Sequence, residues 1–322
     1  MYGIGVDIGA TYTRVVVGDE KGRFLVKITE RTVRKGGPEA LSLQIIKMIK
    51  QALKDSSVSL NEVSGIGVGS IGPLDYKKGI LIKPANLPLE NIPIVDPLSK
   101  EFRLKTTLLN DCTVAVIGER FFGVGKRHEN LVYITISTGI GGGVYVDGHL
   151  LIGKDGNAAE IGHMVVDSEG KLTCGCGRRG HWEAYSSGSG IPKHARMIIE
   201  REGGFKDSML YDKTEGNPDL LDSKMIYDAA KEGDELALRI VDEVGRYNAI
   251  GFANIVNIYD PSLITIGGSV ALNNQELILK PILKYIDDYV VNRKPEIVIT
   301  SLGGDIVLHG ALALALGLEK IY

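Results

Sequence analysis

The chain has 322 residues, a length that suits two domains. Apolar residues make up 44% and charged residues 24%, and 37 Lys and Arg against 40 Asp and Glu give a net charge of −3. This balance lacks the basic excess that is typical of proteins that bind nucleic acid or anionic membranes. The N-terminus has no signal-peptide pattern, and no apolar run reaches ~18 residues. We therefore expect a cytoplasmic protein without a membrane span.

Strands that end in glycine-rich turns, with helices between them, are predicted along the chain. Strands are expected within residues 2–10, 13–28, 63–75, 106–111, 130–137, 141–152, 262–268 and 295–303. Helices are expected within residues 38–56, 112–123, 234–260, 273–291 and 307–320. This alternation predicts an α/β fold.

Two stretches of the chain share one plan of strand, turn and strand. They are "GVDIGATYTRVVV" at 5–17 and "ITISTGIGGGVYV" at 134–146. They are either two unrelated hairpins or the marks of a duplicated α/β domain, whose two turns face each other across a cleft. Glycine lets backbone N–H groups approach an anion closely, threonine adds a donor, and a carboxylate nearby can hold Mg²⁺ through water. Tight hairpins also need glycine for their own sake, but the pair together favours phosphate binding.

Two better-known phosphate motifs are not supported. "GVGSIG", at 67–72, fits the dinucleotide pattern but is followed by "PLDYKKG", which predicts a turn where that pattern needs a helix. The P-loop pattern is absent from the sequence.

The stretch from 162 to 188 holds a candidate metal site. Cys174 and Cys176 are one residue apart, and His163 and His181 flank them. With only three cysteines in the chain, a disulfide framework is not expected, whereas two cysteines and two histidines can bind zinc tetrahedrally. A site with four protein ligands is closed, which suits a structural metal. The alternative is that "CGCG" is a tight turn without a metal.

Six motifs, in order along nearly the whole chain, resemble those of the ROK group of sugar kinases, within the actin and sugar-kinase superfamily. "DIGAT" and "STGIGGG" resemble its two phosphate motifs, with Ala10 in place of a glycine. "LLND" resembles its catalytic Asn-Asp, "AAEIGH" its sugar-binding motif, and "ITIGGSV" its adenosine segment. "CGCGRRGHWE" resembles its zinc signature, with His181 in place of a third cysteine.

The resemblance implies a two-domain, actin-like (ribonuclease H-like) α/β fold with a cleft between the domains. Residues 1–112 plus 305–322 would form a small N-terminal domain, and residues 113–304 a large C-terminal domain with the zinc loop. It also implies ATP, Mg²⁺ and structural Zn²⁺ as cofactors. A homo-oligomer, a dimer or tetramer, is expected.

The resemblance also implies roles for particular residues. Spacing alone favours a helix cap at Asp111, whereas the resemblance makes it the base that takes the proton of the sugar 6-hydroxyl. The residues implied in sugar binding are Gly72, Asn86, Asn110, Asp111, Glu160, His163 and Glu183. The residues implied in binding ATP and its phosphates are Asp7, Gly9, Ala10, Thr11, Thr138, Gly139, Gly267, Gly268 and Ser269.

The expected activity is that of an ATP-dependent glucokinase in carbohydrate metabolism and glycolysis, phosphorylating D-glucose at O6. Ala159 precedes Glu160 where many of the family's glucokinases have glycine, so an N-acetylmannosamine or N-acetylglucosamine kinase is the first alternative. The "GVGSIGP" loop also resembles that of the family's fructokinases. From another class, a sugar-sensing protein without activity is the rival. A repressor is not expected, because the first phosphate motif begins at Asp7 and leaves no room for a DNA-binding segment.

Overall fold

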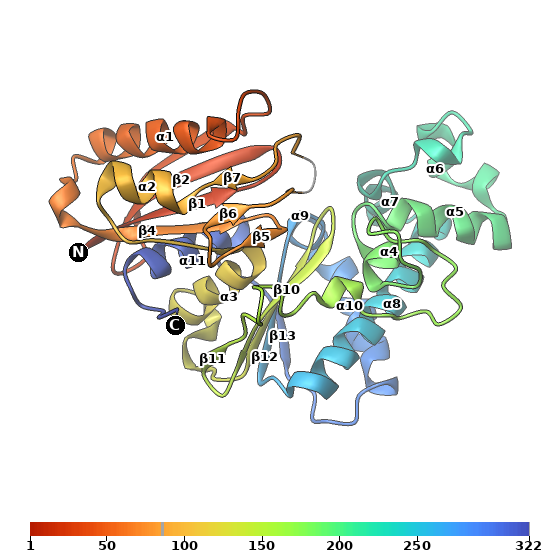
Figure 1. The fold of residues 1–322 in the computed structure, drawn as a ribbon. Helices are drawn as coiled ribbons and strands as arrows, with labels where there is room; N and C mark the ends of the chain where they lie inside the picture. The colour runs from red at the N-terminus through yellow and green to blue at the C-terminus, as the bar shows by residue number, and fades with distance from the viewer. Residues whose placement is uncertain (85–86, 322) are drawn as a thin grey trace. The chain divides into compact units, whose positions relative to one another are not determined.

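The computed structural model describes residues 1–84 and 87–321, and these residues form two compact units (Figure 1). The first unit comprises Met1–Tyr133, Gly143–Ala159 and Thr300–Tyr322. The second unit comprises Ile134–Gly142 and Glu160–Ile299. The domain ranges predicted from the sequence stay a prediction.

The first unit is built on a five-stranded sheet in the order β3–β2–β1–β4–β8. Its strands are β1 (Tyr2–Ile8), β2 (Tyr12–Asp19), β3 (Phe24–Arg31), β4 (Val63–Ser70) and β8 (Thr106–Asn110). β1 pairs antiparallel with β2, and β2 with β3, whereas β1, β4 and β8 run parallel. The parallel strands β1 and β4 are almost continuously buried, as expected where helices cover both faces of a sheet.

Four helices pack on this sheet. They are α1 (Ala40–Ser56), α2 (Val95–Phe102), α3 (Asp111–Phe121) and α11 (Ile306–Ala315). α1 and α2 cover one face, and α3 and α11 the other (Figure 1). A small sheet of β5 (Leu74–Asp75), β6 (Ile80–Leu81) and β7 (Ile92–Pro93) follows β4. β5 comes directly after the loop at residues 71–73, in agreement with the expectation that no helix follows "GVGSIG".

A second five-stranded sheet has the order β11–β10–β9–β12–β13. Its strands are β9 (Leu131–Ile136), β10 (Ile140–Val146), β11 (His149–Leu150), β12 (Leu263–Gly267) and β13 (Glu296–Ile299). β12 and β13 pair in parallel. The tight connection from β9 to β10 is the glycine-rich turn of the second predicted hairpin.

The rest of the second unit is mainly helical. Its helices are α4 (Trp182–Ser186), α5 (Ile191–Glu202), α6 (Met209–Lys213), α7 (Ser223–Lys231), α8 (Glu235–Tyr259), α9 (Ser269–Asn273) and α10 (Gln275–Tyr285). α8 is the long helix that the sequence predicts, and α4, α7 and α10 pack against it. Within the described ranges, no helix is long and apolar enough to cross a bilayer.

Candidate active site and metal cluster

In the first unit, several predicted site residues meet at one edge of the sheet. The carboxyl ends of the parallel strands are in register, with Ile8 beside Ser70 and Ser70 beside Asn110. The turn after β1, the loop after β4 and the start of α3 therefore lie together. In open α/β sheets, this edge is where ligands bind.

The turn after β1, here the first turn (residues 9–11), has its carbonyl groups occupied. Gly9 O accepts from Thr32 Oγ1 (2.7 Å), Ala10 O from Arg34 Nη1 (3.3 Å) and Thr11 O from Thr32 N (3.0 Å). The amide groups of Ala10 and Thr11 donate to no group in the described part of the chain. Two neighbouring N–H groups are therefore left for a ligand, as in an anion-binding turn. Ala10 is not in the left-handed region of φ, which explains why alanine is accepted where the family motif has glycine.

Asp7 lies at the end of β1, directly opposite Arg14 on β2. Arg14 Nε donates to Asp7 Oδ2 (2.7 Å), and the same guanidinium donates to Gly304 O (2.7 Å) and Asp305 Oδ1 (3.1 Å). Lys27 Nζ also reaches Asp305, at 2.6 Å. Burial raises the pKa of Asp7, while Arg14 opposes that rise. Arg14 thus fixes one carboxylate oxygen of Asp7 in a nearly buried position.

Asn110 and Asp111 join β8 to α3. Asn110 is the N-cap of α3, and its Oδ1 accepts from Cys112 N (2.9 Å). Asp111 is the first residue of the helix, and its Oδ1 accepts from the same amide (2.8 Å). Gly72 lies next to Asn110, since a Cβ on Gly72 would stand 3.7 Å from Asn110 Nδ2. Asn86, also predicted to line the sugar pocket, lies outside the described residues.

In the second unit, the turn from β9 to β10, here the second turn (residues 137–140), has the same organisation. Ser137 O accepts from Gly188 N (2.7 Å), and Thr138 O accepts from Ser189 N (3.2 Å) and Ser189 Oγ (2.8 Å). Gly139 O accepts from Ser137 N (2.9 Å). The amide groups of Thr138 and Gly139 have no hydrogen-bond partner among residues 1–84 and 87–321. This turn also leaves two adjacent N–H groups available to an anion.

The predicted sugar-binding side chains of this unit lie near the second turn. Glu183 Oε2 accepts from Ile140 N (3.0 Å), and Glu183 Oε1 accepts from the Cys174 thiol (3.3 Å). The short helix Ile161–His163 packs against Ile140, since a Cβ on Gly162 would overlap Ile140 O. His163 Nε2 lies 3.8 Å from Glu160 Oε2. The structure thus brings Glu160 and His163 together, and it places Glu183 between Ile140 and Cys174.

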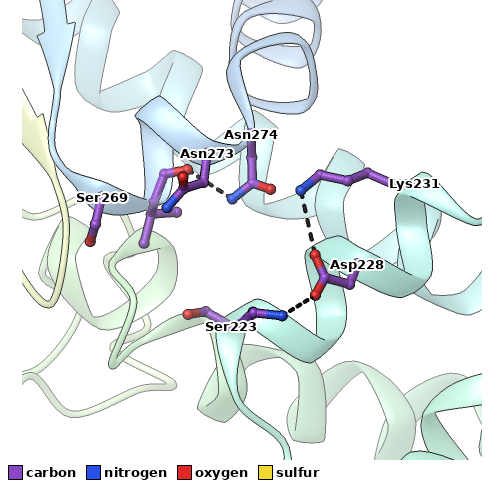
Figure 2. Close-up of a pocket in the computed structure, with 8 residues that line it drawn as sticks. Ser223, Asp228, Lys231, Ser269, Asn273 and Asn274 are labelled. Atoms are coloured by element: carbon purple, nitrogen blue, oxygen red, sulfur yellow. Dashed lines mark hydrogen bonds and ion pairs between the residues drawn. The ribbon is translucent and has the colours of Figure 1, made fainter. Parts of the chain in front are cut away.

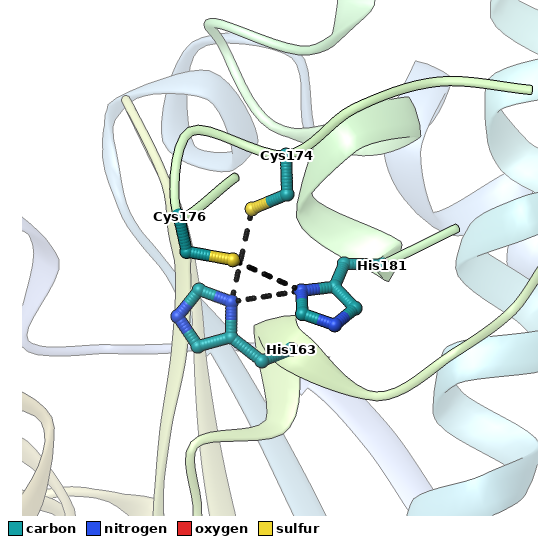
Figure 3. Close-up of side chains that lie close together, drawn as sticks. All are labelled: His163, Cys174, Cys176 and His181. Atoms are coloured by element: carbon teal, nitrogen blue, oxygen red, sulfur yellow. Dashed lines mark hydrogen bonds between the residues drawn. The ribbon is translucent and has the colours of Figure 1, made fainter. Parts of the chain in front are cut away.

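The four predicted metal ligands form one cluster (Figure 3), here the His/Cys cluster: His163, Cys174, Cys176 and His181. Their ligand atoms all lie within 4.8 Å of one another. The two Nδ1 atoms are 3.3 Å apart, Cys176 Sγ is 3.3 Å from His181 Nδ1, and Cys174 Sγ is 3.7 Å from His163 Nδ1. Tetrahedral zinc, with Zn–N of about 2.05 Å and Zn–S of about 2.3 Å, requires N···N of about 3.4 Å and S···N of about 3.6 Å.

Protonation in the cluster follows from burial. Burial raises the pKa of the Cys174 thiol to about 12 and, together with the neighbouring His163, lowers the pKa of His181. His181 is therefore kept in the neutral form that binds metals. A thiol that coordinates a metal loses its proton outright. A divalent cation bound here would therefore convert the Cys174 thiol to a thiolate.

A pocket of about 390 Å³ lies between α7 and α9 in the second unit (Figure 2). α7 contributes Ser223, Lys224, Asp228 and Lys231, and the α9 side contributes Ser269, Val270, Asn273 and Asn274. Ser269 Oγ also lies 3.1 Å from Ser137 Oγ, which connects the pocket to the second turn. Gly267 ends β12, and Gly268 caps α9 with a φ of 87°, which favours glycine.

Three groups at these sites were not found from the sequence. Arg14 faces Asp7 in the hairpin register, so counting residues across the turn could have found it. Ser189 follows α4 and contacts the second turn, and the polar face of α7 lines the pocket. No spacing in the sequence signals these two contacts, because each joins segments that are far apart along the chain.

The sequence profile of the ROK family matches residues 3–317. The glucokinase of Pyrobaculum calidifontis is 37% identical over 313 residues, covering 97% of this chain and 94% of that protein. The ROK hexokinase from Thermus thermophilus superposes with a TM-score of 0.81 at 29% identity, covering 99% of both chains. A ROK family glucokinase from Streptomyces griseus, solved with glucose and AMPPNP, gives a TM-score of 0.77 at 32% identity and covers 98% of this chain and 100% of that one. The predicted α/β, actin-like fold class is confirmed by these structures.

Proposed function

The chain belongs to the ROK family, and we propose on that basis that it is an ATP-dependent glucokinase, which transfers the γ-phosphoryl group of ATP to the 6-hydroxyl of D-glucose. The observation that carries this proposal is the identity to glucokinases over nearly the whole chain, with all six motifs present in order. Phosphoryl transfer needs positioning, charge neutralisation and a base for the incoming hydroxyl. The described residues can supply each of these.

The phosphates of ATP are assigned to the two turns. Ala10 and Thr11 in the first turn, and Thr138 and Gly139 in the second, offer unpaired amide groups, and the threonines add hydroxyl donors. Gly9 belongs to the first turn, where a Cβ would stand 3.1 Å from Tyr12 O. Asp7 would hold Mg²⁺ through water, and the ion would neutralise charge on the phosphates. The orientation of Asp7 is fixed by Arg14.

Asp111 is assigned as the base for the 6-hydroxyl, and Asn110 as a hydrogen-bond partner of the sugar. The support is that both lie at the ligand-binding edge of the sheet, next to Gly72. The other hydroxyl groups of the sugar would form hydrogen bonds with Glu160, His163 and Glu183. A carboxylate has about four acceptor positions, so the two contacts that Glu183 makes within the protein leave room for a hydroxyl. Asn86 stays a prediction.

Zinc is assigned to the His/Cys cluster. The N···N and S···N separations agree with tetrahedral zinc to within a few tenths of an ångström. All four positions would be filled by protein, so the metal would stabilise the loop rather than act on the substrate. His163 directs Nδ1 into the cluster and Nε2 toward Glu160, which leaves one ring nitrogen for the sugar side.

The nucleoside of ATP is assigned to the pocket between α7 and α9. Ser269 lines this pocket and contacts Ser137 of the second turn, and Gly267 and Gly268 directly precede it in the chain. The pocket offers hydroxyl, amide and charged groups for the base and the ribose. A homo-oligomer, a role in glycolysis and a cytoplasmic location stay predictions.

A kinetic panel tests the proposal. ADP release from ATP would be followed with glucose, mannose, fructose, N-acetylglucosamine and N-acetylmannosamine, and glucose is expected to give the highest kcat/KM. A tenfold preference for an N-acetylated sugar, about 1.4 kcal/mol, would replace glucose by a hexosamine. Sugar binding without turnover would favour the sugar-sensing alternative. Elemental analysis of tag-free protein is expected to find one zinc per chain.

A further inference from the structure

The residues that follow the His/Cys cluster contact the second turn. His181 is the N-cap of α4, so the helix starts at a cluster residue. α4 ends at Ser186, and Gly188 and Ser189 come directly after it. Residues 183–189, here the support segment, therefore extend from the cluster to the turn without a break in the chain.

The support segment forms hydrogen bonds with the carbonyl groups of the turn, which would otherwise repel an anion. Gly188 N and the two donors of Ser189 bind the carbonyl oxygens of Ser137 and Thr138. Glu183 binds the Ile140 amide at the other end of the turn. A carbonyl dipole that pointed at a phosphate would repel it, whereas N–H groups attract it. The segment thus fixes which face of the turn its N–H groups present.

The contact between segment and turn is close. A Cβ on Gly188 would stand 2.8 Å from Ser137 O, and one on Gly139 would stand 2.5 Å from Glu183 Oε2. The α4 end is anchored by the fully buried Trp182, whose Nε1 donates to Asn248 Oδ1 (2.9 Å) on α8. The segment cannot shift without moving the turn.

We infer that Ser189 is a positioning residue for the second phosphate turn, and that the support segment couples the His/Cys cluster to ATP binding. Ser189 would act through Thr138 and would not touch the nucleotide itself. The inference rests on the proposed function for the identity of the ligand. Order in the cluster is transmitted to the turn through α4, so occupancy of the cluster affects nucleotide affinity as well as sugar affinity.

The test uses Ser189→Ala, with Ser189→Thr as the conservative variant and Ser186→Ala as the matched control. Ser186 lies on the same segment, but its Oγ donates to Val244 O (3.3 Å) and does not reach the turn. Binding of AMPPNP with Mg²⁺, and of glucose, would be measured by calorimetry on full-length protein. One hydrogen bond is worth about 1 kcal/mol, so Ser189→Ala is expected to weaken AMPPNP binding about three- to tenfold. Glucose affinity and metal content should stay unchanged.

Ser189→Thr should restore AMPPNP affinity, and Ser186→Ala should leave it at the wild-type value. Wild-type AMPPNP affinity in Ser189→Ala, or an equal loss of glucose affinity, would overturn the positioning role. In a second arm, Cys176→Ser and chelator-treated wild type should lose AMPPNP affinity in step with metal content. Loss of metal without loss of AMPPNP affinity would overturn the coupling.

Amide hydrogen exchange separates this inference from the proposed function. Ser189→Ala should speed exchange of the Ser137 and Ile140 amides, which donate within the protein, whether or not the protein is a kinase. If the wild type contains no metal, the zinc assignment and the coupling are both wrong, whereas if it binds neither glucose nor AMPPNP, the proposed function is wrong. The exchange of the Ser137 and Ile140 amides then still decides the role of Ser189, and an unchanged rate would overturn it.

Discussion

The first turn and the second turn present the same groups but are held by different neighbours. In each, the carbonyl oxygens are occupied and two adjacent amide groups are left open. The first turn is held by Thr32 and Arg34, which follow β3 in the same sheet. The second is held by the support segment, which begins beside the His/Cys cluster. A turn held by its own sheet should be indifferent to metal, whereas a turn held by a loop should depend on what orders that loop.

The largest effect is expected from a variant that removes the catalytic base and leaves both turns unaltered. Asp111→Asn keeps the shape of the side chain at the start of α3 but removes the base, so kcat should fall on the order of 10²–10⁴-fold. The KM for ATP should change little, because neither turn is altered. Steady-state kinetics with both substrates measures this. A variant that kept most of its kcat would return Asp111 to the role of a helix residue that accepts from Cys112 N.

Metal removal should distinguish the two turns directly. After chelation, we expect exchange of the hydrogen-bonded amides to rise severalfold at Ser137, at Ile140 and within residues 183–189, and to stay unchanged within residues 8–12. The reason is that only the second turn is joined to the His/Cys cluster through α4. Hydrogen exchange followed by mass spectrometry reads both regions in one sample. Equal acceleration in both turns would show global loosening and would contradict separate support of the two turns.

Thr32→Val tests the first turn in the way that Ser189→Ala tests the second turn. It removes the donor to Gly9 O and the 3.0 Å hydrogen bond between Thr32 Oγ1 and the buried Thr13 Oγ1, and it leaves Thr32 N in place. Losing these two hydrogen bonds, each worth about 1 kcal/mol, should weaken AMPPNP binding about three- to thirtyfold. This loss of AMPPNP affinity should be the same with and without chelator. Metal-dependent loss in this variant would contradict independent support of the first turn.

The smallest effects concern two alanines that stand where the family motifs have glycine. Ala159 has a φ of 61°, in the left-handed region, whereas Ala10 does not. Ala159→Gly should stabilise the fold by up to about 1 kcal/mol, because glycine relieves strain there. Ala10→Gly should destabilise it by about 0.5–1 kcal/mol, because it adds freedom to the unfolded chain. Denaturant titration of both variants checks for opposite signs.

The sequence predicted regular elements well where a strong local pattern decides them. The period of α8, the apolar runs of β1 and β4 and the glycine turns all lie where they were expected. The helix α2 and the sheet β5–β7 were missed, because they are short and depend on packing in the core of the first unit. Local propensity has little weight in segments of two to eight residues.

Candidate site residues were predictable when the chemistry lies in one motif. All four residues of the His/Cys cluster come from a single stretch, and the structure brings them together. Arg14 meets Asp305 from the opposite end of the chain, and Ser189 meets Thr138 from a separate loop. The pairings of Arg14 with Asp305 and of Ser189 with Thr138 are set by tertiary packing, so no spacing rule could have found them, whereas the hairpin register could have indicated Arg14 opposite Asp7.

The local origin of the His/Cys cluster has a thermodynamic consequence. Its ligands lie between positions 163 and 181, so the unfolded chain keeps them close together, and closing the loop again costs little entropy. An ion that also binds the unfolded chain shifts the unfolding equilibrium by less than its affinity for the native site suggests. Tight metal binding should therefore coexist with a modest gain in the global free energy of unfolding. Chelation should therefore lower the midpoint of thermal melting only slightly, while it clearly speeds amide hydrogen exchange within residues 163–189.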